Sequence, residues 1–393
     1  MKNFVSDGLR ELWVSPPGNL PALDGARAIA VLLVICDHYA YYWKELGQPH
    51  LSITSLPIFT WGWTGVDLFF ILSGLLIGQQ LWKEYQSTSS VDLFQFVMKR
   101  GFRIWPLYFA TLLALTMLPL VFKPIWTDFV FVSNYVHVGS GYVRGWSLSA
   151  EEQFYLLTPF LFFVLRRRGP RWIFGVLCSI LVCVLLSRWG TSQALLAQGV
   201  DAATIKDKMY YLFHLHSDAL FAGLMLAYLN VHFKGVLHTT DSHGFARRIA
   251  AVGVVLVMLA LTLRHLDGFV FGFFALALIY VSLVAWLLVD RSVVSAPFRW
   301  RIFYPLSRLS FGMYLNHFVV PGTAAFFIAG ARQVTSSEPL VFLFGLVGSI
   351  MQSVFIAAVT FVLIERPGLL ARARFLAWYK SRAIPKGVAQ PSA

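Results

Sequence analysis

The chain has 393 residues, of which 58% are hydrophobic, 16% aromatic and 13% charged. Soluble globular domains carry about 25% charged residues, so most of this chain cannot face water. The formal net charge of +13 would favour nucleic-acid binding in a soluble protein. Here the basic residues lie in short clusters between apolar runs, where they orient a membrane protein and contact anionic lipid headgroups. We therefore exclude a soluble domain and a nucleic-acid partner.

Apolar runs long enough to cross a membrane recur along the chain. A helix needs about 20 residues to span the hydrocarbon core, and its backbone polar groups must be paired there. The sequence therefore predicts an all-α, polytopic membrane bundle of about ten transmembrane helices. The expected spans are residues 26–43, 62–82, 105–122, 149–165, 172–188, 209–230, 248–264, 269–289, 305–328 and 340–363.

Ten spans place both termini on one side of the membrane. With that topology, 24 of the 32 Lys and Arg residues lie on the side of the termini. This bias predicts that both termini are cytosolic. We expect a cytosolic N-terminal segment without a cleaved signal peptide (1–22), a transmembrane domain (23–367), and a basic cytosolic tail that starts as an interfacial helix (368–393).

The first span carries Arg27 and His38, and Asp24 is placed to cap it. Arg27 and His38 are 11 residues apart, so they share a helix face about 16 Å apart along the axis. A buried arginine can hold an anionic donor, and a neutral histidine can deprotonate a hydroxyl or accept an acyl group. Alternatively, Arg27 reaches the headgroups and His38 bonds a neighbouring helix.

The second and third spans add further candidates. Ser73 stands beside Gly74 in mid-span, where small residues usually indicate close helix packing; a nucleophilic role is the less favoured alternative. Arg100 and Arg103 lie at i and i+3, before Pro106 opens the third span. Such a pair can clamp a phosphate, although it could also simply mark the cytosolic side.

The fourth span is expected to enter from the outer side. Ser147 or Ser149 can cap it, with Glu151 or Glu152 in its first turn. We expect this end to lie in the same outer layer as His38, so that one carboxylate orients the imidazole. Because the two glutamates are adjacent, only one is expected to face the site, and Glu151 is the candidate.

Two histidine-containing segments follow. His214, His216 and Asp218 cluster near the outer end of the sixth expected span. A conventional zinc site needs three or four convergent ligands, so we predict substrate or packing contacts there and no metal. Asn316 and His317 are expected as polar contacts near the midplane of the ninth span.

Six segments together resemble the acyltransferase-3 family of membrane O-acyltransferases. In chain order they are LDGARAIAVLLVICDH, GWTGVDLFFILSGLLIG, KRGFRIWPLYF, WSLSAEEQFYLLTP, SFGMYLNHF and IERP. The resemblance implies transfer of an acyl group, most often acetyl, from cytosolic acyl-coenzyme A. The implied acceptor is a hydroxyl of a glycan, lipid-linked sugar or macrolide. It also implies a multi-pass protein of the bacterial inner membrane, with no permanently bound cofactor.

The resemblance assigns roles to particular positions. His38 matches the catalytic histidine, Arg27 its arginine partner, Arg100 and Arg103 the paired arginines that engage donor or acceptor, and Glu151 the acidic position. Other candidates for substrate contact or support are Ser73, Trp146, Ser147, Tyr155, His216, Asp218 and His317. This sequence departs from the family pattern in having His216 where many members have arginine. Many members also append an SGNH domain, and we expect none in this sequence.

The resulting hypothesis is an enzyme in which coenzyme A phosphates bind the arginines. The pantetheine arm carries the thioester toward His38, which acts as general base or acyl carrier with Glu151 orienting it. The alternative is a transporter or flippase of a polar lipid-linked substrate, since intramembrane charges also serve transport. Coenzyme A binding distinguishes the two classes.

Overall fold

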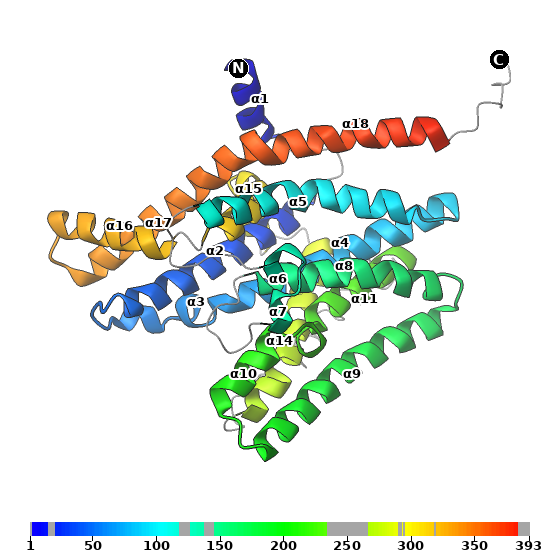
Figure 1. Cartoon of the computed structure of the whole chain (residues 1–393), viewed down its shortest axis with the longest axis horizontal. Helices are drawn as coiled ribbons and strands as arrows, with labels where there is room; N and C mark the ends of the chain where they lie inside the picture. Colours follow the sequence, from blue (N-terminus) through cyan, green and yellow to red (C-terminus); the bar gives the residue numbers. More distant parts are fainter. Residues whose placement is uncertain are drawn as a thin grey trace.

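The structure is a computed structural model that describes residues 2–14, 20–117, 126–136, 145–233, 266–289, 293, 295–317 and 320–383. Throughout these residues the regular elements are helices (Figure 1). The predicted all-α class is therefore confirmed.

Helices of very different length follow one another along the chain. The first part contains α1 (Lys2–Glu11), α2 (Pro21–Glu45), α3 (Pro57–Thr60), α4 (Gly65–Thr88) and α5 (Leu93–Met117). The middle part contains α6 (Trp126–Phe129), α7 (Ser133–Val136), α8 (Trp146–Leu165), α9 (Pro170–Ala197), α10 (Ala202–Tyr211) and α11 (Asp218–His232). The last part contains α14 (Leu266–Val289), α15 (Phe303–Asn316), α16 (Val320–Val334), α17 (Glu338–Thr360) and α18 (Arg366–Ala383).

Among the described residues, four helical segments are long and apolar enough to cross a membrane. They are Gly62–Thr88, Pro170–Ala197, Phe269–Val289 and Glu338–Arg382. Further expected spans overlap α2, α5 and α8, and the span expected at 248–264 lies outside the described residues. The total of about ten spans and the side of the termini stay predictions.

Two expected spans are wrong as continuous helices. The helix expected at 209–230 is split, because α10 ends at Tyr211 and α11 begins only at Asp218. The helix expected at 305–328 is split between α15 and α16. Pro321 explains the second break, since it cannot donate to the carbonyl four residues earlier. Non-helical backbone at membrane depth is tolerated inside protein or beside a cavity.

The boundaries of α5 and α18 also differ from those expected. Pro106 does not open a helix but lies inside α5, which starts at Leu93. Helix α18 continues α17 through a π-helical turn (Phe361–Glu365) and runs alongside α5 (Figure 1). A pair of aromatic contacts, Phe94 with Phe375 and Phe102 with Phe375, joins the two helices. The tail helix is thus part of the packed bundle.

Glycines allow α4 and α11 to pack with their backbones almost in contact. A Cβ on Gly74 would lie 2.1 Å from the Leu220 carbonyl oxygen, and one on Gly223 would lie 2.2 Å from the Ile71 carbonyl oxygen. Gly78, four residues after Gly74, faces the same helix. Small residues at this spacing let membrane helices approach closely. The close helix packing expected around Ser73 is therefore made by its neighbour Gly74.

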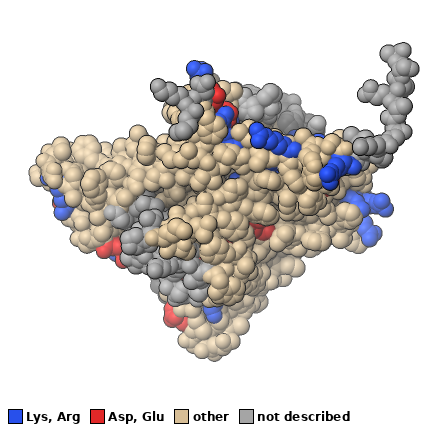
Figure 2. All heavy atoms as spheres, turned by 45° about the horizontal axis from the view of Figure 1, so that its top comes forward, with Lys and Arg blue, Asp and Glu red and all other residues tan. Residues whose placement is uncertain are grey.

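Large apolar side chains remain exposed on the outer helices. Examples are Leu156 and Phe160 on α8, and Leu186 on α9. In Figure 2, Lys and Arg gather near α18 and at the edges of the molecule, and a broad uncharged surface lies between them. An exposed apolar surface of this extent needs an apolar environment, which agrees with the long apolar helices of a membrane protein.

The α4–α11 contact gives a test of the fold. We expect Gly74→Ala to lower the free energy of unfolding by about 1–3 kcal/mol, because its methyl group would meet a backbone carbonyl. Gly175→Ala on α9 is the matched control, since a Cβ added there would have no neighbouring atom within 4 Å. Thermal unfolding of detergent-purified protein measures both. Equal melting temperatures would contradict the close packing.

Candidate active site

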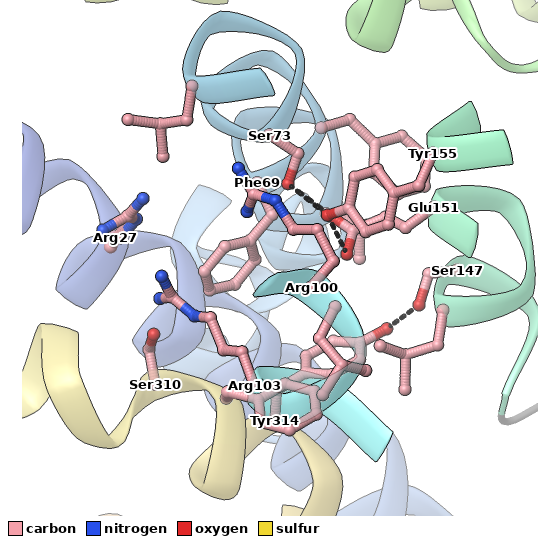
Figure 3. A pocket seen from close by; sticks show the side chains of 16 residues that line it. Arg27, Phe69, Ser73, Arg100, Arg103, Ser147, Glu151, Tyr155, Ser310 and Tyr314 are labelled. Atoms are coloured by element: carbon pink, nitrogen blue, oxygen red, sulfur yellow. Dashed lines mark hydrogen bonds between the residues drawn. The ribbon is translucent and has the colours of Figure 1, made fainter. Parts of the chain in front are cut away.

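A cavity of about 110 Å³ lies among α2, α4, α5, α8 and α15 (Figure 3). Seven of the predicted site residues line it: Arg27, Ser73, Arg100, Arg103, Ser147, Glu151 and Tyr155. They come from four helices that are far apart in the sequence. The fold thus brings most of the predicted site together.

Three arginines face this cavity. Arg27 comes from the second turn of α2, and Arg100 and Arg103 lie one turn apart on α5. Figure 3 shows their guanidinium groups around the same space. Arg100 also donates from Nη2 to Gln80 Oε1 at 3.3 Å. Like charges repel strongly where water is scarce, so this cluster favours an anionic ligand such as a phosphate.

A hydrogen-bonded group of three side chains forms the wall beside the arginines. Ser73 Oγ donates to Glu151 Oε1 at 2.7 Å, and Tyr155 Oη donates to Glu151 Oε2 at 3.1 Å. The Arg100 guanidinium carbon lies 5.7 Å from the centre of the Tyr155 ring. Glu151 and Tyr155 share a face with Ser147, because four residues separate successive members on α8. Both carboxylate oxygens of Glu151 are thereby engaged inside the cavity.

The expected helix caps are wrong. Helix α8 begins at Trp146 without a side-chain cap; Ser147 bonds the Tyr314 hydroxyl, and Ser149 bonds Ser133 at 3.0 Å. These serines join helices instead of closing a helix end, because their hydroxyls face neighbouring helices.

Helix α2 likewise has no side-chain cap. Asp24, expected to cap it, accepts a hydrogen bond from Ser307 Oγ at 2.8 Å. This bond ties the cytosolic start expected for α2 to α15. The acidic residue therefore fixes the position of the helix that carries Arg27 and His38.

His38 lies three turns beyond Arg27 on α2, with its side chain 37% exposed. Its Nδ1 is 2.9 Å from the Val34 carbonyl oxygen. A carbonyl can only accept, so Nδ1 carries the hydrogen and the lone pair of a neutral ring is on Nε2. The Asp37 carboxylate is 3.9 Å from Nδ1, and the His317 ring packs edge-on at 4.6 Å.

Helix α15 connects His38 to the cavity. Ser310 and Tyr314 line the cavity, and His317, one turn further along, contacts His38. The Tyr314 hydroxyl bonds Ser147, and the centres of the Tyr314 and His317 rings are 5.2 Å apart. Polar and aromatic side chains therefore lead from the arginines to the imidazole. Arg27 and His38 share the face of α2 toward α15, as their spacing predicts.

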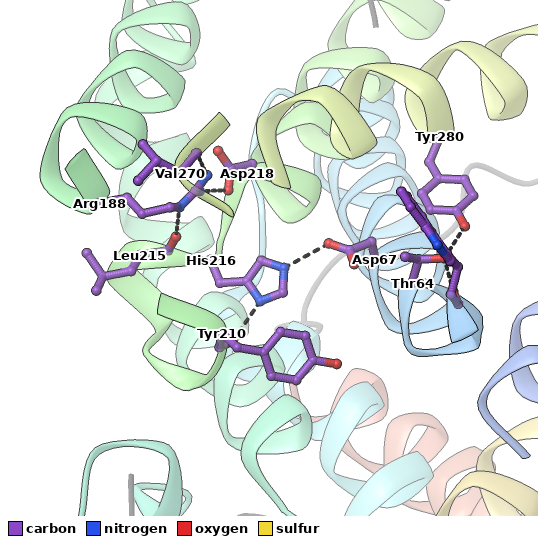
Figure 4. A network of polar contacts seen from close by, with 10 residues as sticks. Thr64, Asp67, Arg188, Tyr210, Leu215, His216, Asp218, Val270 and Tyr280 are labelled. Atoms are coloured by element: carbon purple, nitrogen blue, oxygen red, sulfur yellow. Dashed lines mark hydrogen bonds and ion pairs between the residues drawn. The ribbon is translucent and has the colours of Figure 1, made fainter. Parts of the chain in front are cut away.

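His216 does not line the cavity and lies in a second polar network (Figure 4). His216 Nε2 is 2.9 Å from Asp67 Oδ1, and its Nδ1 is 2.7 Å from the Tyr210 carbonyl oxygen. The Trp146 ring stacks on the imidazole at 5.7 Å. His214 is exposed and bonds a tyrosine of α7 instead. His214 and His216 therefore make contacts with different helices and do not converge on one site.

Asp218 completes this network through Arg188, which is fully buried. The Arg188 guanidinium donates to Asp218, to the Leu215 carbonyl oxygen at 2.6 Å and to the Val270 carbonyl oxygen at 2.7 Å. It therefore joins α9, α11 and α14 (Figure 4). Arg188 is the last residue of the span expected at 172–188, but α9 continues to Ala197 and places it inside the helix.

Sequence reasoning missed Arg188, Ser310 and Tyr314. Arg188 stands in a long apolar stretch, and an arginine at such depth indicates a buried partner. Ser310, Tyr314 and His317 follow the spacing i, i+4, i+7, which places them on one helix face. The sequence contains both signals. It does not show which residues these side chains contact, because those residues lie on other helices.

The Arg188–Asp218 pair is expected to be structural. Arg188→Leu or Asp218→Leu should each lower the free energy of unfolding by about 3–5 kcal/mol, because either leaves a buried charge unpaired. The double variant should recover part of that loss. Arg332→Leu is the control, since Arg332 and Glu338 form an exposed pair, and its loss should cost less than about 1 kcal/mol. Additive losses in the double variant, measured by thermal unfolding, would contradict the pairing.

The chain belongs to the acyltransferase-3 family. The family model, described as an acyltransferase domain, matches residues 20–358.

Its relatives include a Staphylococcus aureus (strain COL) protein provisionally named as an O-acetyltransferase, 26% identical over 332 residues, which cover 77% of this chain and 50% of the relative. Another is the O-acetyltransferase OatA of Staphylococcus aureus (strain NCTC 8325 / PS 47), 31% identical over 44% of this chain and 29% of the relative. The chain spans about half the length of the first relative and less of the second. No solved structure matches it.

Proposed function

We propose that this protein is a multi-pass O-acyltransferase of the bacterial inner membrane, with both termini in the cytosol. It would move an acyl group, most simply acetyl, from acyl-coenzyme A to a hydroxyl. The acceptor would be a glycan, a lipid-linked sugar or a macrolide-type molecule. The observation that carries the proposal is the convergence of Arg27, Arg100 and Arg103 on one cavity that α15 connects to His38.

The arginine cluster suits the donor. Coenzyme A carries phosphates at one end and the thioester at the other. Guanidinium groups bind phosphate oxygens through short, charge-assisted hydrogen bonds. Arg27 and His38 are separated by about 16 Å along α2, a distance that an extended pantetheine arm can bridge. Phosphates at the arginines would therefore leave the thioester near His38.

His38 suits the chemical step. Nε2 of the neutral ring would take the proton of the acceptor hydroxyl, whose oxygen then attacks the thioester carbonyl. The carbon–sulfur bond breaks, and the coenzyme A thiolate leaves and takes up that proton. In the other route, Nε2 attacks the thioester first, the carbon–sulfur bond breaks and the coenzyme A thiolate leaves. The acceptor hydroxyl then attacks the acyl-imidazole, its proton passes to the thiolate, and the bond between Nε2 and the acyl carbon breaks. Both routes use the same nitrogen.

Glu151 supports the donor side of this site. Its carboxylate lies near Arg100, and its hydrogen bonds hold Ser73 and Tyr155 in the cavity wall. A negative charge there offsets part of the repulsion among the arginines. We therefore replace the expected role in orienting His38 with one in organising the donor cavity.

A transporter or flippase of a polar lipid-linked substrate is the second candidate. The polar side chains that lead from the arginines to His38 would also suit passage of a charged headgroup. Such a protein would neither bind coenzyme A nor need a base at His38. The two experiments that follow separate the candidates.

His38→Ala should reduce acyl transfer by at least about 100-fold, because general-base catalysis typically contributes 10²–10⁴. Radiolabelled acetyl-coenzyme A is supplied to membranes containing the protein and extracts of acceptor lipids and glycans, and labelled products are counted. His214→Ala is the matched control, since His214 is exposed and bonds Tyr135 away from the cavity. Transfer by His38→Ala at the rate of the control would exclude His38 as the reactive group.

Arg100→Gln and Arg103→Gln should each weaken coenzyme A binding about tenfold or more, because a hydrogen bond to a charged group contributes about 1.5–3 kcal/mol. Titration calorimetry on the purified protein measures the dissociation constant. Arg167→Gln removes an exposed charge from the turn between α8 and α9 and should leave binding unchanged. A wild-type protein that binds no coenzyme A would favour the transporter.

A further inference from the structure

The long helix that ends the described chain contains one wide turn. A π-helical turn, Phe361–Glu365, joins α17 to α18. Pro367 follows within two residues; it has no N–H for the Leu363 carbonyl, and its ring crowds that oxygen. A π turn relieves the conflict by inserting an extra residue into the helix. Such turns occur frequently at functional sites, so the side chains whose direction this turn changes are candidates for a functional role.

Glu365 is the residue turned inward. Its side chain is only 8% exposed, and its Oε1 has no hydrogen-bond partner among the described residues. The next residue, Arg366, points away from it and donates to Glu11 of α1 from Nε at 3.0 Å and from Nη2 at 2.9 Å. Glu365 and Arg366 therefore form no ion pair with each other. A buried carboxylate without hydrogen bonds is costly unless other cations lie close.

Helices α15 and α5 surround the carboxylate. A Cβ on Gly312 would lie 3.3 Å from Glu365 Oε1, and the Arg308 guanidinium carbon lies 5.4 Å from the centre of the Phe361 ring. On the other side, a Cβ on Gly368 would lie 3.0 Å from the Phe102 carbonyl oxygen. Glu365 thus lies beside the turn of α5 that carries Arg103.

Arg103 of α5 and Arg308 of α15 lie close enough to Glu365 to interact with it electrostatically. Arg103 lines the cavity, whereas Arg308 donates to the Tyr304 hydroxyl at 3.0 Å. No described residue accepts a hydrogen bond from the Arg103 guanidinium, in contrast to that of Arg100. The same holds for Arg27, so the positions of both Arg27 and Arg103 depend on the surrounding charge.

We propose that Glu365 is a positioning residue for Arg103, a carboxylate that keeps this guanidinium in the cluster with Arg27 and Arg100 before a donor phosphate arrives. The inference rests on the proposed donor site. Three guanidinium groups around one small cavity repel one another. A carboxylate placed behind them offsets that repulsion, so that the phosphate meets groups already in place. Preorganised groups bind more tightly because the ligand does not have to order them.

The proposal differs from a purely structural role in what it says about ligands. If Glu365 only stabilised the packing of α18 on α5, its loss would affect all ligands of the cavity alike. If it positions Arg103, its loss affects ligands that carry phosphate and spares those that lack it. Acetyl-coenzyme A and acetyl-pantetheine form such a pair, since they share the thioester and differ in the phosphates.

The test uses Glu365→Gln, which keeps the size of the side chain and removes its charge. The Michaelis constant for acetyl-coenzyme A should rise about tenfold with little change in kcat, while kcat/KM for acetyl-pantetheine stays within about twofold of wild type. Glu365→Asp, which keeps the charge, should recover most of the affinity. Glu11→Gln is the matched control, because it breaks the outward ion pair of the adjacent Arg366 and should change neither constant.

A second arm tests the link to Arg103. The dissociation constant of coenzyme A is measured for Arg103→Gln, Glu365→Gln and the double variant. If Glu365 acts through Arg103, the double variant binds no more weakly than Arg103→Gln alone. Additive effects, an equal loss for acetyl-pantetheine, or unchanged affinity in Glu365→Gln would overturn the proposal while leaving the donor site in place. Unchanged affinity in Arg103→Gln would overturn the donor site itself.

Discussion

The site depends on one constraint, the gathering of three guanidinium groups around a small cavity in an otherwise apolar bundle. Such groups repel one another and lose hydration, so the surrounding helices must supply compensation. Glu151 supplies a carboxylate from α8, with both oxygens held by hydrogen bonds. Glu365 supplies another from the wide turn before α18. An anionic donor would complete the balance, which is why the cluster indicates a phosphate.

Prolines shape the helices around this cluster. Pro106 lies inside α5 and leaves the Phe102 carbonyl without its usual partner. Gly368, just after Pro367, packs on that same carbonyl. Pro321 accompanies the break between α15 and α16, next to His317. Helix α5 continues through Pro106, whereas the turn before Pro367 is widened.

The buried Arg188–Asp218 pair shows that burial of charge has two different uses in this bundle. Arg188 is satisfied by Asp218 and by two backbone carbonyls, so nothing in its surroundings calls for a ligand. The cavity arginines have fewer protein acceptors and face open space. Burial in the bundle therefore does not by itself distinguish Arg188 from the three cavity arginines. Only the number of acceptors around each guanidinium separates a structural cation from a binding one.

The sequence by itself determined the helical class, the candidate arginines and His38, and the shared face of Arg27 and His38, because apolar run length and helix period are local properties. Only the tertiary structure decided that Glu151 joins Ser73 and Tyr155, that Arg188 reaches Asp218, and that α10 and α11 are separate helices. The Arg188–Asp218 and Ser73–Glu151 contacts connect residues 30 and 78 positions apart. No local pattern encodes which helices meet, since that follows from how glycines and side chains of the whole bundle pack together.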